Sequence, residues 1–147
     1  MKILIAEDNA TKANQIRELL LLQLKIDPAD LTFTTNKEET LKILTTQEFN
    51  FLILDMSLPR YSSDLDDIKH LAGKDILIFM RHRRKLIPTV VVTQHDVFGH
   101  HNSQISLENL SSELMKDFSN FLFGVLTWDS SSEHWKDELV KSIESVE

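Results

Sequence analysis

Apolar and polar positions follow two distinct periods along this chain, and the two periods together predict its secondary structure. Short continuous apolar runs predict buried strands, and one alternating run predicts a further strand. The expected strands cover residues 2–6, 31–35, 51–54, 89–93 and 121–128. Apolar residues spaced three and four apart predict helices between them. These helices are expected over about 10–25, 37–47, 75–85, 107–118 and 132–146, with one further short helix between 59 and 73.

The alternation of strand and helix is typical of an α/β protein. Continuous apolar strands indicate a parallel sheet that is covered on both faces, and right-handed crossovers then place helices on each side. We therefore expect a doubly wound, five-stranded parallel sheet in a three-layer sandwich. Of the two common strand orders, the flavodoxin-like order 2-1-3-4-5 would make the first and third strands neighbours. Residues 1–147 are expected to form a single domain without an output module, with extended segments at about 60–72 and 94–106.

Charge and composition narrow the possible functions. The chain has 16 basic and 23 acidic residues, a formal net charge of −7, which argues against non-specific binding to nucleic acid or to an anionic membrane. It has no cysteine, which excludes disulfides, thiol catalysis and cysteine zinc sites. The apolar run at the N-terminus is too short for a signal peptide, and no run is long enough to span a membrane. We expect a cytoplasmic protein.

Polar side chains stand where three of the predicted strands end. Glu7 and Asp8 follow the first strand, Asp55 follows the third, and Thr93 ends the fourth. Because parallel strands end at the same edge of a sheet, we expect these groups to converge at the point where the winding reverses. Clustered carboxylates repel one another unless a cation lies between them, and their hard oxygen ligands suit Mg²⁺. A carboxylate held there could attack phosphorus and form an aspartyl phosphate.

Three stretches carry a resemblance to a known family. "ILIAEDN", "LILDMSLP" and "IPTVVVTQHD" resemble the first, third and fourth strands of response-regulator receiver domains from two-component signalling. The resemblance covers essentially the whole chain. It implies that Asp55 accepts a phosphoryl group from a histidine kinase or phosphotransfer protein. It also implies Mg²⁺ as the cofactor, held by Glu7, Asp8, Asp55 and the backbone carbonyl of Ser57, and a Thr93 hydroxyl that bonds the phosphoryl group and acts as the switch.

The fifth strand departs from the pattern of that family. Receiver domains end this strand with an aromatic residue, a lysine three positions later and then proline, whereas this chain has Val125, Trp128 and Asp129. Lys116 and Lys136 could supply the missing charge only from the flanking helices. Because that lysine neutralises a phosphoryl oxygen, its loss is expected to weaken output more than phosphoryl transfer itself.

The sequence is consistent with two functions, and a third is disfavoured. The first is a stand-alone receiver domain that is not an enzyme beyond self-phosphorylation and self-dephosphorylation. It would signal through contacts with an unknown downstream protein, without binding DNA, and could form a homodimer. The alternative is a degenerate pseudo-receiver that binds its partner independently of phosphorylation. A phosphatase with an aspartate nucleophile is disfavoured, because Ser57 stands where that chemistry needs a second acid.

Other notable residues have ordinary structural interpretations. The basic run 81–85 is interpreted as a solvated helix end, and the histidines near 95–101 as a polar loop without a metal. The leucine run 19–22 is expected to lie in the core, and a role in an interface is the second interpretation. The aromatic residues of the C-terminal third are likewise expected in the core, namely Phe118, Phe121, Phe123, Trp128 and Trp135.

Overall fold

Five apolar runs of the chain form one parallel sheet, in the computed structural model that describes residues 1–59, 71–94, 97–98 and 105–147. The order β2-β1-β3-β4-β7 confirms the predicted 2-1-3-4-5 winding of a flavodoxin-like fold. Every residue of the three central strands is buried, as expected for continuous apolar runs covered on both faces. The strands are β1 (Ile3–Ala6), β2 (Leu31–Thr34), β3 (Phe51–Leu54), β4 (Thr89–Thr93) and β7 (Leu122–Thr127).

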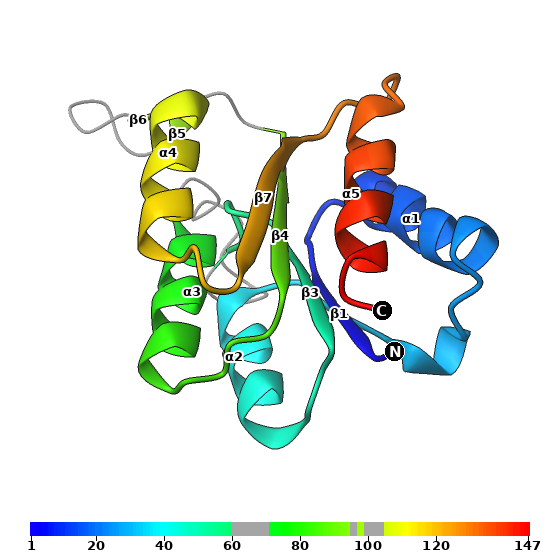
Figure 1. The fold of residues 1–147 in the computed structure, drawn as a ribbon, viewed down its shortest axis with the longest axis horizontal. Helices are drawn as coiled ribbons and strands as arrows, with labels where there is room; N and C mark the ends of the chain where they lie inside the picture. The colour runs from blue at the N-terminus through cyan, green and yellow to red at the C-terminus, as the bar shows by residue number, and fades with distance from the viewer. Residues whose placement is uncertain (60–70, 95–96, 99–104) are drawn as a thin grey trace.

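Helices cover both faces of the sheet and complete the three layers (Figure 1). Apolar residues of α1 and α5 pack with Ile3 and Ile5 on one face. Residues of α2, α3 and α4 pack with Leu4 and Ala6 on the other face, because successive side chains of a strand point to opposite sides. The helices are α1 (Ala10–Glu18), α2 (Lys37–Thr46), α3 (Ala72–His82), α4 (Leu107–Asp117) and α5 (His134–Glu144).

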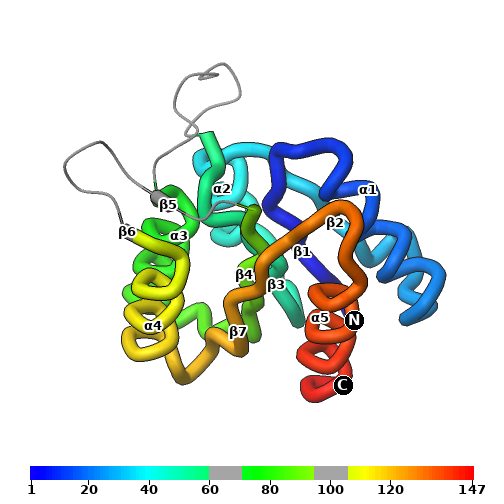
Figure 2. Tube along the Cα trace, turned by 90° about the horizontal axis from the view of Figure 1, so that it is seen from above, coloured from blue at the N-terminus to red at the C-terminus, as the bar shows by residue number. Residues whose placement is uncertain are grey.

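The register of the sheet brings the ends of β1 and β3 to the same level. Ala6 pairs with Leu54 on one side and with Thr34 on the other, so the chain leaves both central strands at one edge. After β1 the chain crosses to α1, and after β3 it crosses to α3 on the opposite face, as the view from above shows (Figure 2). The winding therefore reverses between β1 and β3, and their carboxyl ends flank the reversal.

The predicted helix over about 10–25 is confirmed as far as Gln23, but it changes type in its second half. The α-helix ends at Glu18 and is followed by a π-helical turn, Leu19–Gln23, closed by the Leu24 amide bonding to the Leu19 carbonyl at 3.3 Å. This wider turn buries Leu19 and Leu20 and leaves Leu22 69% exposed, so the leucine run is only partly core. Apolar spacing cannot distinguish an α-turn from a π-turn.

Two helices begin at other positions than predicted. α3 begins at Ala72 rather than Asp75, because the amide of Gly73 donates to the Met56 carbonyl and docks the first turn beside β3. α5 begins at His134 rather than Ser132, whose hydroxyl accepts a hydrogen bond from the His134 amide. A glycine and a capping residue are weak local signals, which explains both shifts.

The extended segment expected over about 94–106 contains two short strands that the sequence did not predict. β5 (Val97–Phe98) pairs antiparallel with β6 (Ile105–Ser106) in a small second sheet. A two-residue strand is too short for any periodicity to reveal. The positions proposed for the short helix and the polar histidine loop lie mostly in 60–70, 95–96 and 99–104, outside the described residues.

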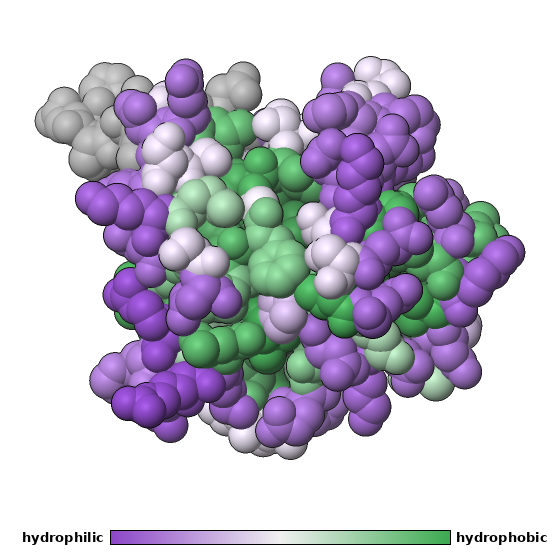
Figure 3. Space-filling model, viewed as in Figure 1, coloured by the Kyte–Doolittle hydropathy of each residue, from purple (hydrophilic) through white to green (hydrophobic). Residues whose placement is uncertain are grey.

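The C-terminal aromatic residues are mostly core, as predicted. Trp135, Phe118 and Phe121 are each 1% exposed, but Phe123 is 42% exposed, so the prediction was wrong for Phe123. β7 is an edge strand, and Phe123 lies on it; apolar side chains are visible over this strand between α4 and α5 (Figure 3). Within the described part of the chain, no helix is long and apolar enough to cross a membrane.

Candidate functional site

Three carboxylates meet at the edge where the winding reverses. Glu7 and Asp55 directly follow β1 and β3, and their amides extend the ladder by donating to the Thr34 and Ala6 carbonyls, each at 2.9 Å. One carboxylate oxygen from each of Glu7, Asp8 and Asp55 can be chosen so that all lie within 4.8 Å of one another. Glu7 and Asp55 are buried and Asp8 is exposed, so this group of three acids, called the acidic pocket below, reaches from the interior to the surface.

The start of α1 orients Glu7. Its Oε2 accepts a hydrogen bond from the Asn9 amide at 3.0 Å, and the Asn9 side chain caps the helix by accepting from the Lys12 amide, also at 3.0 Å. Asparagine is among the preferred capping residues because its side-chain oxygen satisfies a free amide of the first turn. One short segment therefore ends β1, fixes Glu7 and begins the helix that follows.

Lys12 is a functional candidate that the sequence reasoning missed. It lies in the first turn of α1 with a fully buried side chain, and its Nζ is 2.6 Å from Glu7 Oε1 and 3.4 Å from Asp55 Oδ1. A signal was present, because Lys12 falls four residues before Ile16 on the apolar stripe that continues to Leu19 and Leu20. A lysine on a buried stripe is exceptional and indicates a charged partner in the interior.

Burial dominates the electrostatics of Glu7. Its removal from water raises the pKa of Glu7 from 4.5 to about 8, and the neighbouring Asp55 adds to the rise. The Lys12 ammonium and the Asn9 amide oppose the rise, because both favour the charged carboxylate. Desolvation outweighs these contacts, so in the absence of a metal the site tends to retain a proton near neutral pH.

Thr93 and Ser57 take the positions expected for them. Thr93 ends β4 at the same edge of the sheet and is fully buried, and its Oγ1 has no hydrogen-bond partner among the described residues. Ser57 is 3% exposed, in the turn that follows Asp55. Their assignment to phosphoryl and metal binding stays a prediction.

The turn after Asp55 is held against α3 at Gly73. A Cβ atom at Gly73 would lie 2.8 Å from the Asp55 carbonyl oxygen and 2.8 Å from the Met56 Cα, both backbone atoms. Only glycine allows this approach without a shift of the backbone. The first turn of α3 therefore packs directly beneath the Asp55 segment.

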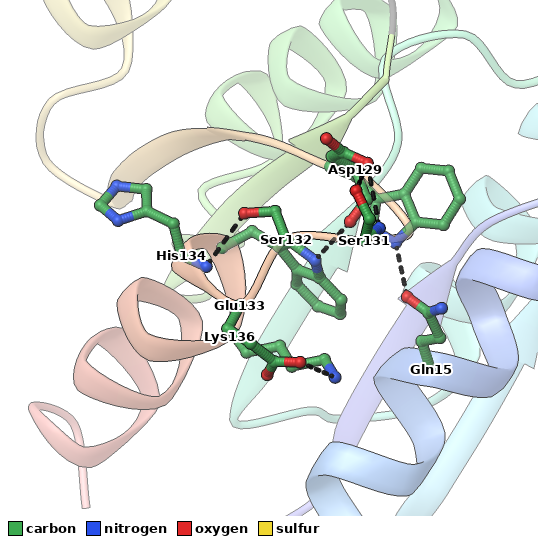
Figure 4. A network of polar contacts seen from close by, with 9 residues as sticks. Gln15, Asp129, Ser131, Ser132, Glu133, His134 and Lys136 are labelled. Carbon is green, nitrogen blue, oxygen red and sulfur yellow. Dashed lines mark hydrogen bonds and ion pairs between the residues drawn. The ribbon is translucent and has the colours of Figure 1, made fainter.

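The end of β7 brings no cation into the pocket. Trp128 stands at the position of the missing lysine; its amide donates to the Thr93 carbonyl at 2.8 Å, and its indole Nε1 donates to Gln15 Oε1 at 3.1 Å. Figure 4 shows Gln15 on α1 pointing towards the segment that follows β7. The tryptophan thus joins β7 to α1.

The lysine found beside the acids is neither of the two that the sequence suggested. Lys136 pairs with Glu133 at 3.3 Å, and Lys116 is exposed on α4. The ammonium in the pocket comes instead from Lys12 on α1, which the comparison with the fifth strand could not reveal. Helix and strand positions far apart in the sequence can supply the same charge to one pocket.

The assembled site offers three kinds of group. Its carboxylate oxygens suit a hard divalent cation, the Asp55 carboxylate is a potential nucleophile, and Lys12 is a fixed positive charge beside it. Such a set is suited to binding and transferring a phosphoryl group, which requires positioning and charge neutralisation.

Comparisons with known proteins agree with this architecture. No protein-family model matches the chain. The chain is 35% identical over 149 residues to the Detocs response regulatory protein DtcB of Enterobacter cloacae, covering 97% of this chain and 98% of that protein. The signal receiver domain of a putative LuxO repressor protein from Vibrio parahaemolyticus has a TM-score of 0.65 at 16% identity, covering 99% and 91% of the two chains. Response regulator TrrA of Thermotoga maritima, solved with Mg²⁺ and BeF, has a TM-score of 0.56 at 20% identity, covering 97% and 99%.

Proposed function

Because this chain belongs to the response-regulator receiver family, we propose that it is a phosphoacceptor domain whose Asp55 receives the signal. The observation that carries this proposal is the convergence of Glu7, Asp8 and Asp55 within 4.8 Å at the reversal of the winding. A histidine kinase or a phosphotransfer protein would be the donor. The alternative that acids merely mark strand ends does not explain why two of them are buried together.

The donor set fits Mg²⁺. Glu7, Asp8 and Asp55 supply hard carboxylate oxygens, and the buried Asp55 Oδ1 has no hydrogen-bond partner among the described residues. We propose these three residues and the Ser57 carbonyl as the protein ligands. When bound, the ion would neutralise charge on the phosphoryl oxygens and on the acids. A site for Mg²⁺ is also a feature of the TrrA complex, although likeness at that identity establishes only the fold.

The proposed chemical step is an in-line displacement at phosphorus. A carboxylate oxygen of Asp55 forms the new bond to phosphorus while the bond between phosphorus and the donor's histidine nitrogen breaks. The electron pair of that bond stays on the imidazole nitrogen. Thr93, whose hydroxyl is buried at the adjacent strand end, would hydrogen-bond a phosphoryl oxygen of the product and report its arrival.

We propose that the phosphorylated domain signals through protein contacts, in the cytoplasm, rather than by binding DNA. The net charge of −7 opposes association with the nucleic-acid backbone. The edge strand β7, where Phe123 is 42% exposed, offers an apolar surface for a downstream protein or a second copy of this chain.

The test is phosphorylation by a small donor. Purified protein incubated with Mg²⁺ and acetyl phosphate should form an acid-stable, base-labile adduct, resolved by intact mass as one added phosphoryl group. Asp55→Asn should abolish the adduct, and Asp137→Asn, on the exposed face of α5, should retain it. No adduct in the wild-type protein despite Mg²⁺ binding would contradict the proposal.

One observation favours the alternative of a phosphorylation-independent binding module. Trp128 occupies the position of the family's lysine, and its indole is hydrogen-bonded to Gln15. The lysine that would join a phosphoryl group to the end of β7 is therefore missing. A module of this kind would bind its partner equally well as wild type, as Asp55→Asn and in the presence of beryllium fluoride. A change in affinity with any of these would exclude it.

A further inference from the structure

Lys12 is the least expected side chain of the pocket. Its Nζ lies between two buried carboxylates, 2.6 Å from Glu7 and 3.4 Å from Asp55, and its side chain is fully inaccessible to solvent. A buried ion pair contributes little to stability compared with apolar residues of the same volume, because both charges lose their hydration. The apolar stripe of α1 would accommodate methionine or leucine here, so stability alone does not explain the lysine.

Three unsatisfied polar atoms lie on residues at the edge of the sheet where the acids converge. Among the described residues, the buried side-chain atoms without a hydrogen-bond partner are Lys12 Nζ, Asp55 Oδ1 and Thr93 Oγ1. The two carboxylates therefore balance the charge of the Lys12 ammonium. The geometry of these contacts does not satisfy its N–H donors as hydrogen bonds. A donor, an acceptor and a hydroxyl left open in one pocket indicate a missing ligand rich in oxygen atoms.

Two other lysines of the described residues are held by acids outside the pocket. Lys37 is held by Asp75 at 2.9 Å, Lys136 is held by Glu133, and the end of β7 carries Trp128. The Trp128 indole is bonded to Gln15, which lies three residues after Lys12 on α1. The residue that replaced the strand lysine thus helps to hold the helix that carries the pocket lysine.

We infer that Lys12 is the phosphoryl-binding cation of this site and reaches the phosphoryl group from α1 rather than from β7. This inference rests on the proposed role of Asp55. An ammonium 3.4 Å from Asp55 Oδ1 is within a side-chain rotation of oxygens attached through that carboxylate. With the carboxylates engaged by a divalent cation, the Lys12 ammonium would be free to turn from Glu7 and donate to a phosphoryl oxygen, so that its charge would stay paired.

The experiment compares binding of trifluoroberyllate, which stands in for the phosphoryl group, at saturating Mg²⁺. Lys12→Met keeps the length of the side chain and removes the charge, Lys12→Arg restores a charge, and Lys116→Met removes an exposed lysine from α4 as the matched control. We expect Lys12→Met to bind trifluoroberyllate about 10- to 100-fold more weakly, which is the value of one charge-assisted hydrogen bond. Lys12→Arg should recover part of the affinity, and Lys116→Met should equal wild type.

A second readout separates the role of Lys12 from general damage. Without trifluoroberyllate, Lys12→Met should bind Mg²⁺ as well as wild type or more tightly, because the competing ammonium is gone from Glu7. In the wild-type complex, a ¹⁹F–¹H nuclear Overhauser effect should connect bound fluoride to the Lys12 side chain, without any substitution.

The outcomes distinguish the two proposals. Equal trifluoroberyllate affinity in wild type and Lys12→Met, or no Overhauser contact to Lys12, overturns the inference and leaves Asp55 as phosphoacceptor. Loss of Mg²⁺ binding in Lys12→Met overturns it as well, because Lys12 would then only support the acids. Failure of the wild-type protein to take up trifluoroberyllate overturns the proposed function and the inference together.

Discussion

The indole nitrogen of Trp128 donates a hydrogen bond to the side-chain oxygen of Gln15, 113 positions away in the sequence and 3.1 Å away in space. This bond joins the carboxyl end of β7 to α1, whose first turn carries Lys12 into the acidic pocket. The backbone of Trp128 also bonds to Thr93, the last residue of β4. The tryptophan therefore connects the strand ends around the pocket to the helix that supplies its cation.

Loss of this bond should lower stability modestly. We expect Trp128→Phe and Gln15→Ala each to reduce the free energy of unfolding by about 1 kcal/mol, the usual value of one hydrogen bond. The double variant should cost clearly less than the sum, because each change removes the same bond. Urea unfolding followed by circular dichroism measures all three. Gln23→Ala, on the exposed end of the π-helical turn, is the control; additive effects of the first pair would show that the bond is not formed in solution.

The stability of the metal-free protein should fall as pH rises above about 4.5. The pKa of Glu7 is raised from 4.5 to about 8 by burial and by Asp55, so between these values the folded protein binds more protons than the unfolded chain. The contribution of Glu7 to the stability of the folded protein is fully present below about pH 4.5. It is lost as the pH rises through the folded-state pKa of about 8. Its magnitude is on the order of 4 kcal/mol.

Thermal unfolding between pH 5 and pH 8.5 checks this dependence. Glu7→Gln cannot ionise, so its stability should vary less with pH than that of wild type, whereas Glu144→Gln, on α5 away from the pocket, should behave like wild type. Saturating Mg²⁺ should flatten the wild-type profile, because a bound cation favours the ionised carboxylate. Parallel profiles for wild type and Glu7→Gln would contradict the raised pKa.

Gly73 should not tolerate a side chain. Its Cβ would meet two backbone atoms of the Asp55 segment at 2.8 Å, so Gly73→Ala forces α3 away from the site and should cost about 1–3 kcal/mol. At Gly124 a Cβ would meet only Leu126 Cδ2, at 3.9 Å, so Gly124→Ala should change stability by less than about 0.5 kcal/mol. Chemical denaturation compares the two. Equal effects at both glycines would show that α3 does not pack on the Asp55 turn as described.

The two sides of the leucine run should respond differently to truncation. Leu20 is fully buried and Leu22 is 69% exposed, because the π-helical turn rotates them apart. Leu20→Ala should reduce the free energy of unfolding by about 2–5 kcal/mol, and Leu22→Ala by less than about 0.5 kcal/mol. A large loss at Leu22 would mean that this leucine is covered in solution, which sedimentation of the wild-type protein would then detect as self-association.

Much of the fold was decided by local pattern. Continuous apolar strands alternating with amphipathic helices predicted the parallel sheet and the edge at which Glu7, Asp8 and Asp55 converge, because strand direction follows from the crossovers. Local pattern was weaker at helix ends and could not reveal the pairing of Val97–Phe98 with β6, because so short a strand has no period.

The cation of the pocket was decided only by the tertiary structure. The sequence shows a lysine at position 12 and a tryptophan at position 128, but whether either faces the acids depends on how α1 and β7 pack on the sheet. The electrostatic interaction between two charged groups depends on their distance in space and not on their separation in the sequence. For that reason the acids, which end strands, could be placed together from the sequence. The apolar stripe marked Lys12 as unusual, but only the packing of α1 placed it beside them.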